Sequence, residues 1–324
     1  MILSVSRRTD IPAFYCEWFM NRVREGFAYV RNPFNPMQVS RVDIRPEVVD
    51  CIVFCTKNAR PLMPYLNELD DLGYKYYFQF TVTPYGRDME GNIPSKSEIV
   101  DTFKQLANMI GTEKVIWRYD PIIITDQYGL DYHIESFRNL CRELKDCTKR
   151  VVISFVDHYR KIAHTLRQLQ VRELSQREMV QIAAPLAAIA REHGMVIESC
   201  AEAIDLSAMV IKHGRCIDGD LIESIVGCEI RNKNTRDANR AYCGCMKSID
   251  IGQYDTCIHG CQYCYANVSP AQAYKNYQQH DPRSPILCGD YDESLIKDRP
   301  DTSSYRIKAD EAFKQGILFP GAWR

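Results

Sequence analysis

The first two hundred residues alternate short runs of β-branched and aromatic residues with longer helical patterns, and this alternation restricts the possible folds more than any other feature. The runs predicted to be strands are Ile2–Ser6, Phe27–Val30, Cys51–Cys55, Tyr76–Thr83, Val115–Trp117, Val151–Phe155 and Met195–Glu198. Apolar runs of this length are typical of parallel strands covered on both faces. Strands joined by helices predict right-handed β–α–β units, so the α/β fold we expect is a complete or partial TIM-type barrel. An open doubly wound sheet is the alternative, although no glycine-rich phosphate loop follows an early strand.

Two sequence patterns predict where helices begin. Ser95 and Ser175 each stand three residues before a glutamate, Glu98 and Glu178, and this spacing is typical of a capping box. We therefore expect one helix to begin after each serine.

Polar residues follow nearly every predicted strand. In a barrel the carboxyl ends of the strands converge on one face, where active sites lie. The candidate catalytic residues there are Arg118, Asp120, Glu198 and Glu202, and the candidate cofactor-binding residues are Arg7, Arg8 and Lys57, with Arg31 adding positive charge. Guanidinium groups suit a carboxylate or a phosphate, so an anionic substrate or a cofactor carboxylate is expected. The alternative is that these side chains form structural ion pairs with one another.

Fourteen cysteines are the unusual part of the composition. The chain is too long to need disulfide bonds for stability, and clustered cysteines in a reducing compartment more often bind metal. Cys257, Cys261 and Cys264 form a C-x3-C-x2-C run, in which Gly260 allows a tight bend. Three thiolates at this spacing can each bind one iron of a [4Fe–4S] cluster and leave the fourth iron open, whereas structural zinc prefers paired C-x2-C ligands. His259, inside the run, is expected to donate a hydrogen bond to a cluster sulfide, and a role as an iron ligand is the alternative.

The segment YDTCIHGCQYCYA, residues 254–266, resembles the signature of the radical S-adenosylmethionine (SAM) enzymes, and most closely their spore-photoproduct-lyase-like branch. This resemblance implies a reduced [4Fe–4S] cluster that binds SAM at its open iron and cleaves it to a 5′-deoxyadenosyl radical. It also implies that Tyr263 packs near the adenine and that an electron donor such as flavodoxin or ferredoxin reduces the cluster. The whole chain, from SVSRRTDIPAFY to DIGQYDTC, resembles an uncharacterised bacterial family of unknown function, which implies no activity.

The position of the motif differs from the family pattern. Radical SAM enzymes carry the motif after the first strand, but here it follows the last predicted strand, and the first strand leads into Arg7 and Arg8. The Gly-Gly-Glu-type segment that usually holds the SAM amino group is also absent from the sequence. A loop from the C-terminal part would therefore have to bring the cluster over the mouth of the barrel.

Four further cysteines could bind a second, auxiliary iron–sulfur cluster. Cys243 and Cys245 lie just before the motif, and Cys200 and Cys216 follow the last predicted strand and its helix. One alternative is that Cys200 and Cys216 are ordinary buried thiols. Another is that Cys243 or Cys245 binds the fourth iron of the main cluster, which would abolish SAM chemistry.

The sequence changes character after about residue 228. We expect a barrel domain at residues 1–228 and a cysteine-rich, cluster-binding segment with a C-terminal wrap at residues 229–324. The basic segment at residues 231–240 could contact nucleic acid. Because 41 Lys and Arg residues face 42 Asp and Glu residues, for a net charge of −1, nucleic acid is not the expected partner. The longest apolar run is too short to cross a membrane and no signal-peptide core precedes Arg7, so a cytoplasmic protein is expected.

These features favour a radical SAM-type enzyme that acts on an unidentified substrate, which the arginines suggest is anionic. A non-catalytic or redox-sensing iron–sulfur protein is the alternative, and a nucleic-acid lesion repair enzyme is suggested by the branch resemblance alone. Charged residues at several strand ends favour an enzyme, because a purely structural cluster needs no such site.

Overall fold

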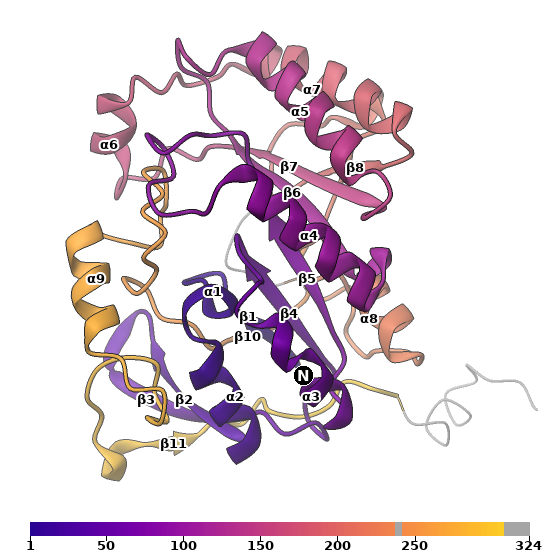
Figure 1. Cartoon of the computed structure of the whole chain (residues 1–324). Helices are drawn as coiled ribbons and strands as arrows, with labels where there is room; N and C mark the ends of the chain where they lie inside the picture. Colours follow the sequence, from indigo (N-terminus) through magenta and orange to yellow (C-terminus); the bar gives the residue numbers. More distant parts are fainter. Residues whose placement is uncertain (237–241, 308–324) are drawn as a thin grey trace, which may run out of the picture.

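The computed structural model describes residues 1–236 and 242–307. Its main sheet consists of β1 (Ile2–Val5), β4 (Cys51–Thr56), β5 (Tyr76–Thr81), β6 (Val115–Ile122), β7 (Arg150–Phe155), β8 (Val196–Ser199), β9 (Lys212–His213) and β10 (Ile249–Asp250). The helices are α1 (Ile11–Phe14), α2 (Cys16–Glu25), α3 (Leu66–Asp71), α4 (Lys96–Ile110), α5 (Leu130–Leu144), α6 (Ala163–Gln168), α7 (Gln176–Glu192), α8 (Gly219–Val226) and α9 (Pro270–Gln278). Figure 1 shows the sheet at the centre of the molecule, with helices on its flanks.

All neighbouring strands of the main sheet are parallel. Their order is β10–β1–β4–β5–β6–β7–β8–β9. From β1 to β9, each strand therefore lies beside the strand of this same sheet that follows it in the sequence. A doubly wound sheet would instead reverse its strand order at a switch point. Within the described part of the chain β9 and β10 do not pair, and the sheet is open. The prediction of a parallel α/β sheet is confirmed, and a closed barrel is not formed by these residues.

The prediction that residues 27–30 form the second strand of the main sheet is wrong. β2 (Phe27–Asn32) pairs antiparallel with β3 (Asn35–Asp43), and β11 (Lys297–Asp298) completes a separate three-stranded sheet. The chain leaves α2 at Gly26, with a φ of 79°, and the hairpin then returns it so that β4 pairs directly with β1. Arg31 donates to the carbonyl oxygens of Pro36 in β3 and of Asp290, and it lines a second cavity together with Arg7 and Arg8.

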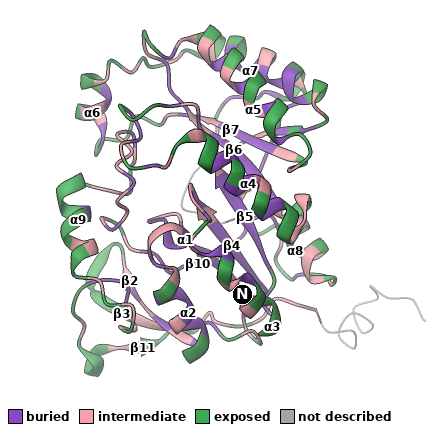
Figure 2. Cartoon of the chain, in the orientation of Figure 1, coloured by how far each residue is buried: buried purple, intermediate pink, exposed green. Residues whose placement is uncertain are grey.

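Helices α2, α4, α5 and α7 cover one face of the main sheet, together with the short helices α1 and α3. Phe19 of α2, Phe103 of α4, Phe137 of α5 and Leu186 of α7 belong to the same buried cluster as Trp117 of β6. Figure 2 shows the strands buried and the outward sides of these helices exposed. Burial of both the strands and one side of each helix accounts for the continuous apolar runs seen in the sequence.

Both predicted capping boxes are confirmed. At the start of α4 the hydroxyl of Ser95 accepts from the backbone N–H of Glu98 at 3.3 Å, and Ser175 and Glu178 make the same contact at 3.3 Å before α7. In each case the glutamate carboxylate accepts in return from the backbone N–H of the serine at 2.9 Å. Each cap satisfies backbone groups that the first helical turn leaves unpaired.

The opposite face of the sheet packs against chain segments from beyond β8. Ile222 of α8 and Met246 join Val53 of β4 and Ile116 of β6 in a second buried cluster. This cluster fills one half of the face, and the half nearer the carboxyl ends of the strands holds the cavity described below.

β10 brings the C-terminal part of the chain into the main sheet beside β1. The Asp250 carboxylate accepts from the hydroxyl of Ser4 at 3.0 Å, from that of Ser6 at 2.6 Å and from the backbone N–H of Gly252 at 2.9 Å. These bonds attach the short strand firmly despite its length of two residues. The segment after residue 228 therefore contributes an edge strand to the main sheet, in addition to any wrap around it.

The described residues after β10 include a helix that the sequence analysis did not predict. α9 begins after Ser269, whose hydroxyl accepts from the backbone N–H of Gln272 at 3.1 Å. Further on, the backbone N–H of Tyr305 donates to Asp50 at 2.7 Å. The predicted basic segment and the predicted wrap extend into residues 237–241 and 308–324, which lie outside the described residues. Where the chain is described, every helix is too short or too polar to span a membrane.

Candidate functional site

A cavity of about 280 Å³ lies at the carboxyl ends of the main-sheet strands. The loops after β1, β4, β7 and β8 line it, together with the carboxyl-terminal residues of β5 and β6 and the loop that carries the C-x3-C-x2-C run. The sequence-predicted residues found there are Arg7, Arg8, Lys57, Arg118, Asp120, Cys200, Glu202, Cys216, Cys257, Cys261, Tyr263 and Cys264. The structure thus brings most of the candidate residues to one place, although they come from both ends of the chain.

The three motif cysteines form part of the cavity wall. Their loop follows β10 and is held in place by a backbone hydrogen bond of 2.9 Å from Asn92 to His259. Gly260 has a φ of 71°, a left-handed conformation that glycine adopts without strain, as the predicted bend requires. Burial raises the pKa of each of the three thiols. Bare thiolates are therefore disfavoured here unless a positively charged group compensates them.

His259 connects the motif loop to the end of the first strand. Its Nε2 lies 2.8 Å from Asp10 Oδ2, and both side chains are buried. Asp10 also accepts from the hydroxyl of Thr56 at 2.7 Å and from the backbone N–H of Lys57 at 2.7 Å. The other ring nitrogen of His259, Nδ1, is buried and has no hydrogen-bond partner among the described residues. With Nε2–H donating to the Asp10 carboxylate, Nδ1 can donate the predicted hydrogen bond to a cluster sulfide only when the ring is an imidazolium.

Glu90 is a candidate that the sequence analysis missed. It lies in the loop between β5 and α4, is 2% exposed, and accepts from Lys57 at 2.8 Å, from Lys96 at 2.5 Å and from Thr83 at 2.5 Å. The hydroxyl of Tyr263 donates to the same carboxylate. Burial alone would raise the pKa of Glu90, but the two ammonium groups outweigh it and lower the pKa to about 2. Lys57, predicted to bind an anion, is thus largely neutralised by Glu90.

Arg118 and Asp120 lie on the inner side of β6 and interact with each other. Arg118 Nε donates to Asp120 Oδ2 at 3.0 Å, and the Ser154 hydroxyl donates to the other carboxylate oxygen. Burial would raise the pKa of Asp120, but Arg118 and Ser154 together lower it. The alternative of a structural ion pair is therefore realised for these two residues, and both still line the cavity.

Of the two candidate glutamates, Glu202 lies at the cavity and Glu198 does not. Glu202 Oε1 accepts from the backbone N–H of Phe155 at 2.8 Å. Glu198 lies 3.7 Å from Arg150, and burial raises the pKa of its carboxyl. It lies in β8, two residues before Cys200 of the cavity wall, and its carboxylate forms an ion pair with Arg150 instead.

Arg7 and Arg8 lie at the rim of the cavity. Arg7 Nε is 3.7 Å from Asp250 Oδ2, so part of its charge is already paired. The guanidinium of Arg8 lies 5.7 Å from the ring centroid of Tyr254 and donates to the carbonyl of Gly252 at 3.4 Å. Arg8 thus contributes positive charge to the rim without a carboxylate among its described contacts.

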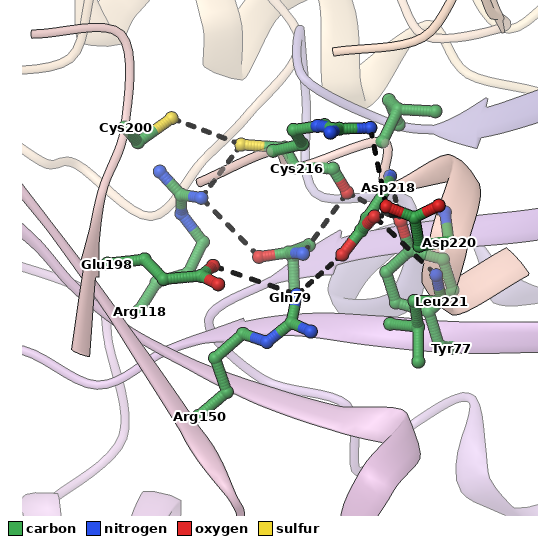
Figure 3. Close-up of polar contacts among 12 residues, drawn as sticks. Tyr77, Gln79, Arg118, Arg150, Glu198, Cys200, Cys216, Asp218, Asp220 and Leu221 are labelled. Atoms are coloured by element: carbon green, nitrogen blue, oxygen red, sulfur yellow. Dashed lines mark hydrogen bonds and ion pairs between the residues drawn. The ribbon is translucent and has the colours of Figure 1, made fainter. Parts of the chain in front are cut away.

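The cysteines predicted to bind a second cluster lie together. Cys200 and Cys216 line the cavity with their sulfur atoms 3.2 Å apart (Figure 3), and Cys245 interacts with both Cys216 and Cys243. A hydrogen bond with Cys245 lowers the pKa of Cys243 to about 7. Within the described ranges, no three His, Cys, Asp or Glu side chains are arranged to bind a single metal ion.

The fold and the site define an α/β protein whose parallel sheet ends in a cysteine-lined cavity. The chain belongs to the family described as "Domain of unknown function (DUF1848)", whose model matches residues 2–266. The predicted resemblance to an uncharacterised family is thereby confirmed, and the matched range includes every cysteine assigned above to either cluster. No curated protein matches the chain. A solved structure titled a "putative alpha-L-fucosidase" from Bacteroides thetaiotaomicron is 11% identical, over 71% of this chain and 83% of that chain. Its TM-score of 0.27 is too low to indicate a shared fold.

Proposed function

We propose that the protein is a radical SAM-type enzyme, in which a partial (β/α) barrel holds a [4Fe–4S] cluster and SAM at one cavity. The observation that carries the proposal is that Cys257, Cys261 and Cys264 lie in the wall of a cavity at the carboxyl ends of parallel strands. Active sites of (β/α) barrels occupy this end of the sheet.

The late position of the motif in the sequence is compatible with this proposal. β10 pairs with β1, so the loop that follows β10 emerges beside the end of the first strand. The bond between His259 and Asp10 fixes it there. In space, the motif therefore lies next to the strand after which the radical SAM resemblance expects it.

The residues of the loop fit a [4Fe–4S] cluster. Cys257, Cys261 and Cys264 would bind three irons. Nδ1 of His259, which has no partner among the described residues, would donate to a sulfide from an imidazolium ring that Asp10 holds at Nε2. When bound, the reduced cluster and SAM would supply a 5′-deoxyadenosyl radical that abstracts a hydrogen atom from the substrate. The thiols must stay reduced before iron binds, which fits a cytoplasmic protein served by a flavodoxin or ferredoxin.

The remaining residues of the cavity would position SAM and the substrate. Tyr263 lines the cavity with its hydroxyl bound to Glu90, so its ring has a fixed place for packing against the adenine. Arg8 suits the SAM carboxylate and Glu202 its ammonium group. Arg118 and Asp120, both charged and held by each other, suit a polar or anionic substrate.

The test is anaerobic reconstitution with iron and sulfide, followed by reduction in the presence of SAM and measurement of 5′-deoxyadenosine. The wild-type chain is expected to form 5′-deoxyadenosine and methionine. Cys264→Ala is expected to form neither, whereas Cys147→Ala, a cysteine outside the cavity, serves as the matched control and should behave like the wild type. Iron-loaded, reduced wild-type protein that neither binds nor cleaves SAM would contradict the proposal and favour a redox-sensing iron–sulfur protein.

A further inference from the structure

Four cysteines from three separate segments meet on the inner face of the main sheet. Cys200 follows β8, Cys216 precedes α8, and Cys243 and Cys245 lie in the segment before β10. All four belong to the buried cluster on this face or pack against it. Each stands outside helices and strands, so its position is set by tertiary contacts and not by the period of a regular element.

The four thiols form a connected group. The sulfur atoms of Cys200 and Cys216 are 3.2 Å apart, well beyond the bond length of about 2.05 Å in a disulfide, so both are thiols. Cys245 continues the group, because its thiol interacts with those of Cys216 and Cys243. Cys245 is 2% exposed. Its sulfur also accepts from the backbone N–H groups of Cys216 at 3.2 Å and of Ile217 at 3.4 Å. Two N–H donors aimed at one buried sulfur are the environment of a thiolate ligand.

A buried cation and a rigid backbone complete the site. Arg118 Nη1 donates to the sulfur of Cys216 at 2.8 Å, and Figure 3 shows its guanidinium pointing at the cysteine pair. The carbonyl of Cys216 accepts from Tyr77 at 2.6 Å and from Gln79 at 3.1 Å, both side chains of β5. An arginine buried against thiols offsets the negative charge that four thiolates and a cluster would carry.

We propose that Cys200, Cys216, Cys243 and Cys245 bind a second iron–sulfur cluster at the floor of the cavity. Four thiolates complete the coordination of such a cluster, so this one has no open iron and cannot bind SAM as the first would. Structural zinc prefers paired C-x2-C ligands, and these four cysteines include no such pair. In a cluster the thiolates bind different irons, so the side chains of Cys200 and Cys216 would turn apart from the 3.2 Å contact of the two thiols when the cluster binds. The proposal does not depend on SAM chemistry, since it uses none of the motif cysteines.

The test removes the first cluster and asks what remains. The full-length chain carrying Cys257→Ala, Cys261→Ala and Cys264→Ala is reconstituted anaerobically, and its iron, sulfide and electron paramagnetic resonance spectrum are measured. We expect it to keep about half of the wild-type iron with a cluster spectrum. Adding Cys243→Ala and Cys245→Ala should remove that iron.

A matched control and a second measurement keep the test decisive if the triple variant folds poorly. In the otherwise wild-type chain, Cys243→Ala with Cys245→Ala should halve the iron, whereas Cys141→Ala with Cys147→Ala, two cysteines outside the group, should keep it all. Three results would each overturn the proposal: full iron in the Cys243 and Cys245 variant, stoichiometric zinc in anaerobically purified triple variant, or a disulfide between Cys200 and Cys216 in the anaerobic wild type. A failure to cleave SAM with eight irons bound would count against the proposed enzyme and leave this second site standing.

Discussion

Glu90→Gln would test how strongly the buried network around the motif is held together by charge. Glutamine keeps the size of the side chain and most of its hydrogen bonds, but it leaves Lys57 and Lys96 without the carboxylate that lies between them. The pKa of Glu90 is lowered from 4.5 to about 2. At about 1.36 kcal/mol for each pKa unit, this difference corresponds to about 3 kcal/mol of stability that the variant would lose near neutral pH.

The same pKa difference sets the pH dependence. Because the folded-state pKa of Glu90 lies below its unfolded-state value, the stabilisation is complete above about pH 5 and is lost as the pH falls towards 2. By pH 4 the wild type is expected to have lost about 0.8 kcal/mol of it, whereas Glu90→Gln has no such contribution to lose. The free-energy difference between the two proteins should therefore shrink on acidification.

Urea unfolding of the iron-free chain, followed by far-ultraviolet circular dichroism at pH 7, 5 and 4, measures both quantities. Glu47→Gln is the matched control, since Glu47 is exposed and should leave the unfolding midpoint unchanged at each pH. A Glu90→Gln protein as stable as the wild type at pH 7 would refute the reasoning. So would a difference between the two proteins that stays constant down to pH 4.

Three further changes have expected outcomes. Tyr263→Ala should leave the iron content unchanged and weaken SAM binding about three- to tenfold, for a lost aromatic contact of about 0.5–1.5 kcal/mol, as measured by equilibrium dialysis. Asp10→Ala leaves the buried donors of Thr56 and His259 without an acceptor, and should lower the free energy of unfolding by at least about 2 kcal/mol in urea titrations. Phe34 lies at the tip of the β2–β3 hairpin and is 90% exposed, so Phe34→Ser should change the free energy of unfolding by less than about 0.5 kcal/mol in the same urea titrations. A larger loss would contradict the exposed position of this ring.

Local signals in the sequence predicted local structure well. The capping boxes at Ser95 and Ser175 and the strand runs depend on residues a few positions apart, and the structure confirms them. The bend at Gly260 follows from the same kind of local reasoning. Six of the seven predicted strands consequently lie in the parallel sheet.

Features that depend on distant contacts were not predictable in the same way. The composition of β2 predicted a strand of the parallel sheet, but β2 pairs antiparallel with β3. The partner of a strand is decided by the connecting turn and by tertiary packing, which composition does not show. Glu90 lies in an irregular loop without a motif, and its importance arises only when two lysines and Tyr263 meet it in space. Glu198 shows the reverse, because a carboxylate at a strand end looked catalytic and is instead paired with Arg150 away from the cavity.

The pairing of β10 with β1 also determines when the sheet can be finished during synthesis. Ser4 on β1 pairs with Asp250, and at about 5–20 residues per second the ribosome needs roughly 12–50 s to make the chain between them. β4 can pair with one edge of β1 soon after it is synthesised, but the other edge of β1 has no β10 to pair with during this interval. Unpaired strand edges of this kind are prone to pair with other chains. The motif cysteines follow β10 in the chain, so β10 has already been synthesised when the motif loop is made.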